Sequence, residues 1–543
     1  MRARFVVFAV SLFGVLLLSG CVSREKTPSA KCLTALSAGQ TVRVKETSDG
    51  WTFFLPSYAD RDRITLLSTQ ELQIGDEKLS AFTQTEFPLT GNDPVLAVSA
   101  GGRTVDLHIR FSAKFPALFL SLDESRGSFS AMEADKEKKA ACYGDGVLIS
   151  EDRTAQKIGS LSLSGRGNST WQREKNPYKL NLDKKADLLG MGSSKKWALL
   201  AMYDDPSLIR NLLGMQVASD IGFNYVPEGK LVDLYIGGVY KGTYTLFERI
   251  KIDPERLDVA DLEEMIDAVL SVWNDAYETD YKTLSELWSA APDACALSPD
   301  GASFTVSLPA GDMTIDLTQG YLLEIDFYKD TPQFLLPSGT KVTVKSPENL
   351  ASDVSDPLFS YLSDHLFAAE ASLDADSDVF LSFFDTDSFA KAWLLKEFTM
   401  DFDACVSLYM VLSPDGKFQA GPIWDLENIF ALNRTIYGNA DPLYQVVANG
   451  GRHETVESWL TKIARFPAFR EAVKDAYKTC EEVFDGERVA AYAQGFLDTA
   501  SGSAKLNALL FPEKTREDES GFLLDFIRRR AEAFPTVVAE ATK

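Results

Sequence analysis

Residues 396–433 read KEFTMDFDACVSLYMVLSPDGKFQAGPIWDLENIFALN. Two carboxylates in alternation, Asp401 and Asp403, stand before a β-like apolar run. The run ends at Ser413-Pro-Asp-Gly416, a strong turn signal because proline and glycine favour the backbone angles of tight turns. A second apolar run follows the turn, so this stretch predicts a β-hairpin.

The second arm of the predicted hairpin, residues 421–424, leads into another acidic pair, Asp425 and Glu427. If the two arms pair across the turn, both acidic pairs lie at the same end of the hairpin. Four carboxylates gathered there would repel one another unless a cation lies among them. Hard divalent ions such as magnesium take oxygen ligands of this kind. Ordinary solvated acids at strand ends would produce the same pattern.

The charge balance of the whole chain restricts its partners. Its 543 residues include 55 lysines and arginines against 79 aspartates and glutamates, a formal net charge of −24. A surface this acidic disfavours binding to nucleic acid, and to anionic membranes, through general electrostatic attraction. The length allows about two or three domains, and a hydrophobic fraction of 45% is that of a globular protein.

Residues 1–20 have the composition of a secretory signal. Arg2 and Arg4 supply positive charge, and residues 5–18 form an apolar segment that is short for a membrane span. The segment ends in Leu18-Ser-Gly-Cys21, and small residues before a cysteine resemble a bacterial lipobox. This resemblance implies that Cys21 is acylated and that the mature, extracytoplasmic protein is tethered to a membrane. A signal-anchor helix is the alternative.

Few residues suit a site built from histidine or cysteine. The five cysteines beyond Cys21 are scattered and include no Cys-x-x-Cys pair, which argues against a zinc ribbon or a disulfide-dense scaffold. Three histidines also leave little material for a zinc centre or a Ser-His-Asp triad. Carboxylates are therefore the main candidates for chemistry.

Changes in composition suggest where the domains begin and end. Residues 21–50 are polar without a clear period and are interpreted as a tether. Residues 51–122 contain short β-like runs separated by turn residues, which predicts a small β-sandwich of immunoglobulin type. Residues 123–543 form the main domain. Within it, an amphipathic helix is predicted from Leu262 to Trp273, where apolar residues recur with a helical period.

A short glycine-containing segment, Gly165-Arg-Gly-Asn-Ser-Thr170, lies between two β-like runs. Glycines let backbone amides approach a phosphate closely, and Arg166 and Lys179 would add positive charge. A tight hairpin turn would produce the same pattern. The clearest hairpin of the chain is predicted at residues 231–247, where alternating apolar residues flank Gly237-Gly238.

Other short segments of the main domain form a series: Arg166-Gly-Asn-Ser-Thr-Trp171, Asn176-Pro-Tyr-Lys-Leu180, Lys184-Lys-Ala-Asp-Leu-Leu-Gly190, Lys195-Lys-Trp-Ala-Leu-Leu200, Pro206-Ser-Leu-Ile-Arg-Asn211, Val232-Asp-Leu-Tyr-Ile-Gly237, Gly320-Tyr-Leu-Leu-Glu-Ile-Asp326, Val344-Lys-Ser-Pro-Glu348, Asp403-Ala and Gly421-Pro-Ile-Trp-Asp425. Together and in this order, they resemble the CotH-type spore-coat protein kinases. The resemblance covers roughly residues 148–430, within which about 262–319 looks like an insertion.

The resemblance implies an α+β fold, an atypical two-lobed protein-kinase-like domain preceded by the β-sandwich. Such kinases bind ATP and magnesium and phosphorylate serines on partner proteins, here at the cell surface or envelope. The implied roles are phosphate binding by Arg166, Asn168, Ser169 and Lys179, a place near the adenine for Glu248, action on the acceptor hydroxyl by Asp403, and magnesium binding by the catalytic Asp425 with Asp401 and Glu427. Phosphoryl transfer needs these groups.

The chain departs from the family pattern at three positions. Asn181 stands where lysine is usual, Asp401 where asparagine is common, and Glu427 where a second aspartate is usual. The neutral amide of Asn181 cannot supply the positive charge that the usual lysine brings near the phosphates. Lys179 would have to supply it instead. An active kinase and an inactive pseudokinase, serving as a surface binding or structural lipoprotein, both remain open. A solute-binding lipoprotein would need two comparable α/β lobes, which the pattern does not show.

Overall fold

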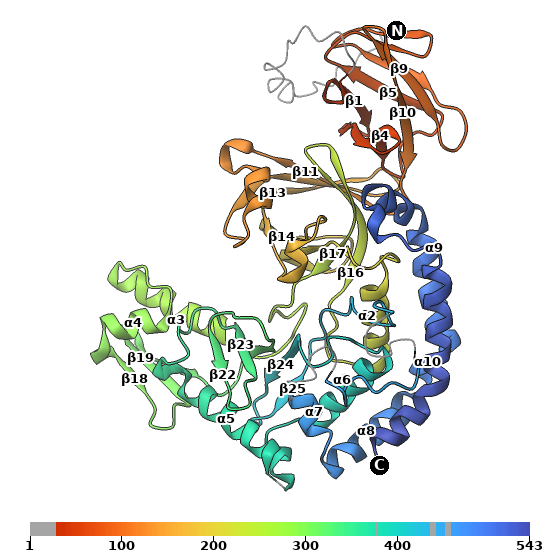
Figure 1. Ribbon diagram of the computed structural model, residues 1–543. Helices are drawn as coiled ribbons and strands as arrows, with labels where there is room; N and C mark the ends of the chain where they lie inside the picture. The colour runs from red at the N-terminus through yellow and green to blue at the C-terminus, as the bar shows by residue number, and fades with distance from the viewer. Residues whose placement is uncertain (1–28, 376, 435–440, 451–457) are drawn as a thin grey trace, which may run out of the picture. The chain divides into compact units, whose positions relative to one another are not determined.

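The computed structural model describes residues 29–375, 377–434, 441–450 and 458–543 (Figure 1). The predicted signal segment 1–20 and Cys21, the residue predicted to be lipidated, lie outside these residues. The chain is a mixed α/β protein with several sheets, one of which closes into a seven-stranded barrel. None of the helices in the described residues is both long and apolar enough to span a membrane. The five cysteines that the structure describes carry free thiols.

The smaller of two compact units consists mainly of the residues up to Leu55 and of Ala59–Phe111. It contains a four-stranded sheet, in the order β2-β1-β5-β8, and a six-stranded sheet, in the order β3-β4-β10-β9-β6-β7. Its strands are β1 (Leu33–Ser37), β2 (Gln40–Arg43), β3 (Lys45–Thr47), β4 (Gly50–Leu55), β5 (Arg63–Ser68), β6 (Leu72–Ile74), β7 (Glu77–Leu79), β8 (Gln84–Pro88), β9 (Val95–Ala100) and β10 (Arg103–Phe111).

The strands of this unit begin earlier than the sequence suggested. The tether predicted for residues 21–50 is wrong beyond residue 32, because Leu33, Ala35 and Val42 are buried in β1 and β2. These strands are so short that their alternation of buried and exposed residues does not stand out from the polar background. At the other end, the predicted boundary at 122 is too late, since residues 117–122 form a strand of the larger unit.

The larger unit begins with the closed barrel, in the order β11-β12-β13-β14-β15-β17-β16, which a parallel pairing of β11 with β16 completes. Leu163, Leu180, Trp197 and Leu234 are among the side chains of its buried core. Strands β16 and β17 confirm the hairpin predicted at 231–247. The strands are β11 (Ala117–Leu122), β12 (Ala141–Ile149), β13 (Ala155–Gly165), β14 (Tyr178–Asp187), β15 (Ser193–Leu200), β16 (Gly229–Ile236) and β17 (Val239–Glu248).

A five-stranded sheet, in the order β22-β23-β21-β24-β25, follows the barrel in the same unit. Its last two strands confirm the hairpin of residues 396–433, since Met410 pairs with Ala420 and the amide of Gly416 donates to the carbonyl of Ser413 (2.9 Å) in the turn. The strands are β21 (Tyr321–Ile325), β22 (Gln333–Leu335), β23 (Lys341–Ser346), β24 (Leu408–Leu412) and β25 (Phe418–Ala420).

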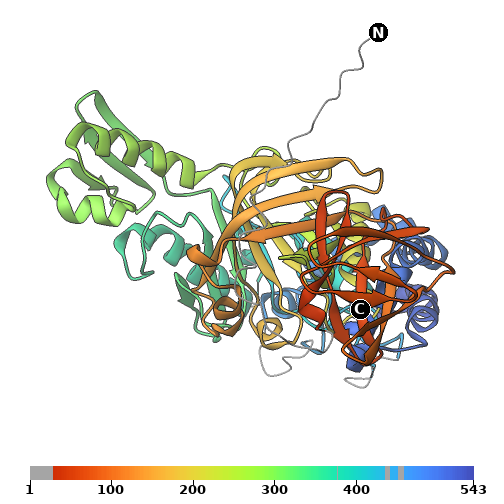
Figure 2. The same cartoon turned by 90° about the horizontal axis from the view of Figure 1, so that it is seen from above.

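The segment between the barrel and this sheet forms a small substructure with its own three-stranded sheet (light green in Figure 2). Its first helix confirms the predicted amphipathic helix, and the Asp261 side chain caps it by accepting from the amide of Glu264. Its elements are α3 (Leu262–Tyr277), α4 (Leu284–Ala290), β18 (Cys295–Leu297), β19 (Ser303–Leu308) and β20 (Gly311–Asp316).

Helices supply the rest of the larger unit (Figure 1). Helix α1 packs against the barrel strands β12 and β13, while most of the others share a core with the five-stranded sheet. A buried ion pair between Glu397 and Arg530 (3.0 Å) joins two of them, and the guanidinium group also donates to the carbonyls of Pro442 and Tyr444. The helices are α1 (Phe129–Ala134), α2 (Arg210–Ile221), α5 (Ser360–Asp374), α6 (Thr386–Phe398), α7 (Trp459–Ile463), α8 (Pro467–Cys480), α9 (Gly486–Leu510) and α10 (Glu519–Ala541).

Candidate active site

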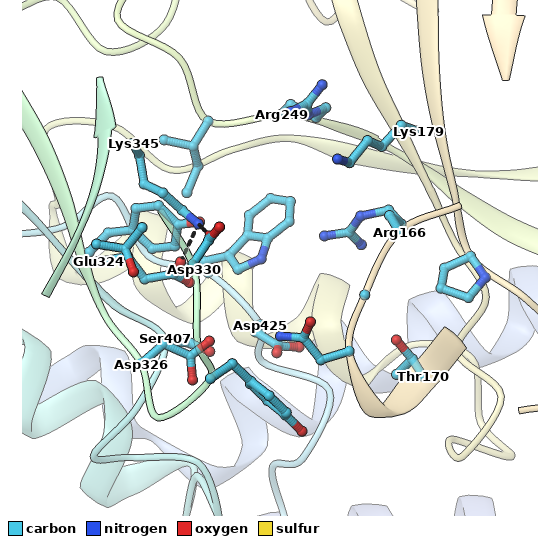
Figure 3. A pocket seen from close by; sticks show the side chains of 18 of the residues that line it. Arg166, Thr170, Lys179, Arg249, Glu324, Asp326, Asp330, Lys345, Ser407 and Asp425 are labelled. Carbon is cyan, nitrogen blue, oxygen red and sulfur yellow. Dashed lines mark hydrogen bonds and ion pairs between the residues drawn. The ribbon is translucent and has the colours of Figure 1, made fainter. Parts of the chain in front are cut away.

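A cavity of about 740 Å³ in the larger unit is lined by residues of the barrel and of the five-stranded sheet. In Figure 3, Arg166, Lys179 and Arg249 point into it from the barrel side, whereas Glu324 and Lys345 come from the sheet side. The volume suits a ligand of nucleotide size. The cavity is therefore lined by cations on the barrel side and by both a carboxylate and a lysine on the sheet side.

The loop after β13 forms part of the barrel wall. Gly167 has a φ of +78°, in the left-handed region that favours glycine, and a Cβ there would lie 2.1 Å from Oγ1 of Thr170. The next aromatic residue, Trp171, is buried, and its Nε1 donates to the carbonyl of Asp135 (2.8 Å). The loop is thus held in a tight turn that directs Arg166 into the cavity, with its guanidinium group over the ring of Trp424 (5.4 Å).

Several cations line the cavity from the barrel side, among them Lys138, Arg166, Lys179 and Arg249. Burial lowers the pKa of Lys179, and the charges of the other three lower it further. Burial likewise lowers the pKa of Arg166, although Asp425 opposes this effect. Within the described residues, no ion pair neutralises Arg166 or Lys179. Mutual repulsion of this kind is relieved when an anion such as a phosphate enters.

Asn168 and Ser169 also line the cavity, as the sequence suggested. The side-chain oxygen of Asn168 accepts a hydrogen bond from Nζ of Lys138 (3.4 Å), and the carbonyl of Gly167 accepts another (2.5 Å). Lys138 was not predicted from sequence. Through these two hydrogen bonds Lys138 holds the loop in place, and it also adds a positive charge beside the loop.

Asp403 lies on the sheet side and is 2% exposed. Its Oδ2 accepts a hydrogen bond of 2.6 Å from Nδ2 of Asn428, a residue that the sequence analysis did not single out. The amide of Phe402 donates to the carbonyl of the same asparagine (3.0 Å). Asn428 therefore joins the two acidic segments of the hairpin and fixes one oxygen of Asp403.

Asp425 is exposed to the cavity, and its backbone has a φ of +60°. A non-glycine residue in this region is uncommon, and such strain concentrates at functional sites. Helix α2 holds the following residues in place: Oδ1 of Asn211 accepts from the amide of Leu426 (3.3 Å), and Nε of Arg210 donates to the carbonyl of Ile429 (3.0 Å). The segment therefore has a fixed support behind Asp425.

Glu427 lies beside Asp425 and lines the same cavity. Burial and the charges of Asp425, Asp205 and Asp204 raise the pKa of Glu427 to about 8, against the influence of Lys175. Burial in turn lowers the pKa of Lys175 to about 7; its Nζ donates to the carbonyls of Ala201 (2.7 Å) and Thr243. Asp205 pairs with Arg210, and Asp204 with Arg173 and Lys514, but negative charge still predominates around Glu427. A divalent cation would stabilise the ionised form of Glu427.

Two of the predicted site residues do not line the cavity. Asp401 is fully buried and forms an ion pair with Lys396 (2.9 Å), while its Oδ1 accepts from the amide of Asp403 (2.9 Å). Because a lysine already neutralises it, Asp401 supports the loop of Asp403 and does not fit the metal-binding role suggested from sequence. The predicted gathering of four carboxylates is therefore reduced to Asp403, Asp425 and Glu427.

Glu248 is the second of these residues. It is buried and forms an ion pair with Arg256 (3.1 Å), and its other oxygen accepts from the hydroxyl of Tyr225 (3.1 Å) and the amide of Glu228 (2.8 Å). Residues 249–252, which directly follow it, do line the cavity. Glu248 thus anchors the end of β17 and does not itself face the ligand space.

The family model described as CotH kinase protein matches residues 163–534, more than half of the chain. The chain belongs to the CotH kinase family. Among curated proteins it has no match. Membership of the CotH kinase family implies a kinase-like function, and the resemblance proposed from the sequence is confirmed.

In this CotH kinase family member, Asp425 and Glu427 could bind magnesium together with phosphate oxygens of a substrate. Within the described residues, no group of three or more histidine, cysteine, aspartate or glutamate side chains is arranged to hold a metal ion. Magnesium, however, is commonly bound by one or two carboxylates together with phosphate oxygens of the substrate. Asp425 and Glu427 can serve in that arrangement, with the phosphates supplied by a nucleotide on the barrel wall.

Asn181 stands where the CotH pattern has a lysine, and a cationic side chain lies beside it. Its Oδ1 accepts a hydrogen bond of 3.3 Å from NH1 of Arg249, a cavity residue from the end of the barrel. A guanidinium group therefore reaches the part of the wall where the lysine is missing. The sequence did not indicate that Arg249 could take the place of the missing lysine, since Arg249 and Asn181 are 68 residues apart in the chain.

Proposed function

We propose that this chain is a protein kinase that transfers the γ-phosphate of ATP to a serine or threonine hydroxyl of a protein. In this proposal the barrel and the five-stranded sheet with its helices act as the two lobes of a kinase-like domain. The observation that supports it best is that one cavity is lined by the cations Arg166 and Lys179 and also by the carboxylates Asp403 and Asp425. Phosphoryl transfer requires this combination.

Each residue has a defined task in the proposed reaction. Arg166, Lys179 and Arg249 bind and orient the phosphate oxygens, and Asp425 with Glu427 would hold magnesium. When bound, the metal ion neutralises charge on the phosphates and fixes their geometry. Asp403 accepts a hydrogen bond from the acceptor hydroxyl and takes its proton as the hydroxyl oxygen bonds to the γ-phosphorus and the bond from that phosphorus to ADP breaks. Asn428 holds the carboxylate of Asp403 in a fixed orientation by donating to its Oδ2.

An inactive pseudokinase that binds a partner is the second candidate, and it rests on Asn181. The hydrogen bond from Arg249 to Asn181 favours the active kinase, because it brings a permanent positive charge to that position. Arginine also suits the recognition of phosphate oxygens by two parallel hydrogen bonds.

Binding of the nucleotide tests the first part of the proposal. We expect ATP with magnesium to raise the thermal stability of the full chain, and ATP with a chelator to raise it much less. A ligand at about 100 times its dissociation constant adds about 2.7 kcal/mol to the free energy of unfolding. Differential scanning fluorimetry gives the result. Equal melting temperatures with and without nucleotide would show that the cavity does not bind ATP.

The compartment of the kinase follows from the N-terminal sequence. We propose that it is an extracytoplasmic lipoprotein whose Cys21 carries the lipid and whose substrates are proteins of the cell surface or envelope. Two features of the sequence support lipidation: the small residues before Cys21, and the apolar segment 5–18 that follows the charged Arg2 and Arg4.

Replacing Cys21 by serine is expected to release the protein from the membrane fraction or to block its processing, since a hydroxyl cannot form the thioether of a lipoprotein. Cell fractionation and the mass of the mature protein measure the outcome. Cys32→Ser is the matched control, because the nearby Cys32 lies outside the lipobox. A Cys21→Ser protein of unchanged mass in the membrane fraction would disprove lipidation at this residue.

A further inference from the structure

Lys345 reaches the cavity from the sheet side, on strand β23. Its Nζ lies 2.8 Å from Oε2 of Glu324 on the neighbouring strand β21 and 3.1 Å from Oδ2 of Asp330. Figure 3 shows both contacts at the wall opposite Arg166. No role was assigned to any of these three residues from sequence.

The two carboxylates around Lys345 differ in their surroundings. The Glu324 side chain is 9% exposed and belongs to a strand in the middle of the sheet. Asp330 is 53% exposed and belongs to the loop between β21 and β22. An exposed ion pair contributes little free energy, whereas a buried one is costly to break. Lys345 can therefore exchange Asp330 for another anion while Glu324 keeps it in place.

The charge of Lys345 acts on the same space as the cations of the barrel. It is one of the positive charges, after those of Arg249, Arg166 and Lys138, that lower the pKa of the buried Lys179. Burial alone would lower the pKa of Lys345 itself, but Glu324 and Asp330 outweigh burial and raise it. Lys345 thus stays protonated and adds its positive charge to those of Lys138, Arg166, Lys179 and Arg249 around the cavity.

We propose that Lys345 binds the phosphate chain of the nucleotide from the sheet side, with a phosphate oxygen taking the place of Asp330. This inference rests on the proposed function and extends it. Cations from the barrel alone would contact the phosphates on one side. Lys345 closes the site from the other side, so that the phosphate chain bridges the two halves of the domain.

A purely structural role for Lys345 is the competing explanation. The loop that contains Asp330 lines the cavity, and a second lysine of the same strand also holds it: Nζ of Lys341 donates to the carbonyl of Phe327 (2.6 Å). Lys341 is not among the residues that line the cavity. Lys341→Met therefore removes a contact to the loop without removing charge from the phosphate space, and it is the matched control for Lys345→Met.

The experiment measures binding of magnesium tripolyphosphate, magnesium ATP and adenosine to the full chain by isothermal titration calorimetry. Loss of a charge-assisted hydrogen bond corresponds to about a 10- to 100-fold weaker affinity. We expect Lys345→Met to weaken both phosphate ligands by this factor and to leave adenosine unchanged. Lys341→Met should bind all three like the parent. Parent-like binding of tripolyphosphate by Lys345→Met would overturn the inference, as would equal losses in the two variants.

Asp330→Asn provides a test that misfolding cannot imitate. If phosphate replaces Asp330, removing this competing charge should tighten tripolyphosphate binding, by up to about fivefold for an exposed pair. If Asp330 serves only to tie down the loop, the same substitution should leave binding unchanged or weaken it, and the inference fails.

The two proposals fail in different ways. The nucleotide function would be contradicted if the parent chain bound tripolyphosphate more tightly than ATP and did not bind adenosine. In that case, tripolyphosphate binding by the Lys345 variants would still decide the role of Lys345. A parent chain that binds none of the phosphate ligands would overturn both.

Discussion

Replacing Asp403 by asparagine should lower phosphoryl transfer about 100- to 10,000-fold, the usual contribution of a positioned general base. The amide retains the shape of the side chain but cannot take the proton of the acceptor hydroxyl. Nucleotide binding should persist, because in the proposed mechanism Asp403 acts on the acceptor hydroxyl, whereas the cations of the barrel wall would hold the phosphates. The rate of phosphate incorporation and the affinity for magnesium ATP, measured side by side, separate the two effects.

Asp415→Asn is the matched control for this variant. Asp415 lies in the turn of the same hairpin, where its carboxylate accepts from the hydroxyl of Ser413, and it does not line the cavity. The two substitutions make the same change of charge in the same hairpin. Equal transfer by the Asp403→Asn protein and the parent would exclude the proposed role of Asp403.

Replacing Asp425 by asparagine should abolish the magnesium-dependent part of nucleotide binding and, with it, transfer. The change removes a carboxylate that lines the cavity and is exposed to it, and a neutral amide is a poor ligand for a hard cation. The fold should be retained, since asparagine tolerates the left-handed backbone found at this position. The measurement is the rise in melting temperature on adding ATP, with magnesium and with a chelator.

In the parent, the rise should depend strongly on magnesium, and in the Asp425→Asn protein it should be the same with and without the ion. The melting temperature of the variant without ligand shows whether the fold survives. Magnesium-dependent protection equal to that of the parent would show that the metal ion is held elsewhere.

The hairpin and its acidic ends were predictable because their signals are local. The turn at Ser413–Gly416 lies between two apolar runs, so the pairing of β24 with β25 required no knowledge of distant residues. The spacing of the acidic residues could not show, however, that Asp401 and Asp403 have different environments. Their difference depends on Lys396, at the end of α6, which neutralises one carboxylate and leaves the other at the cavity.

Residues that meet across the fold were missed for a physical reason. Lys345 lies beside Glu324 only because β23 pairs with β21 in a register that contains an irregularity at Leu322 and Leu323. A shift by one residue would place Lys345 on the other face of the sheet. The contact of Arg249 with Asn181 likewise depends on β15 pairing with both β14 and β17, which no local pattern encodes.

Transfer of label from ATP is the most direct test of the central claim that this chain phosphorylates a protein hydroxyl. The purified full chain is incubated with envelope proteins, magnesium and ATP labelled on either the γ- or the α-phosphate. We predict that label from the γ-position enters serine or threonine residues, that label from the α-position does not, and that a chelator stops the reaction. Incorporation of the α-label, or of no label at all despite bound ATP, would contradict the claim.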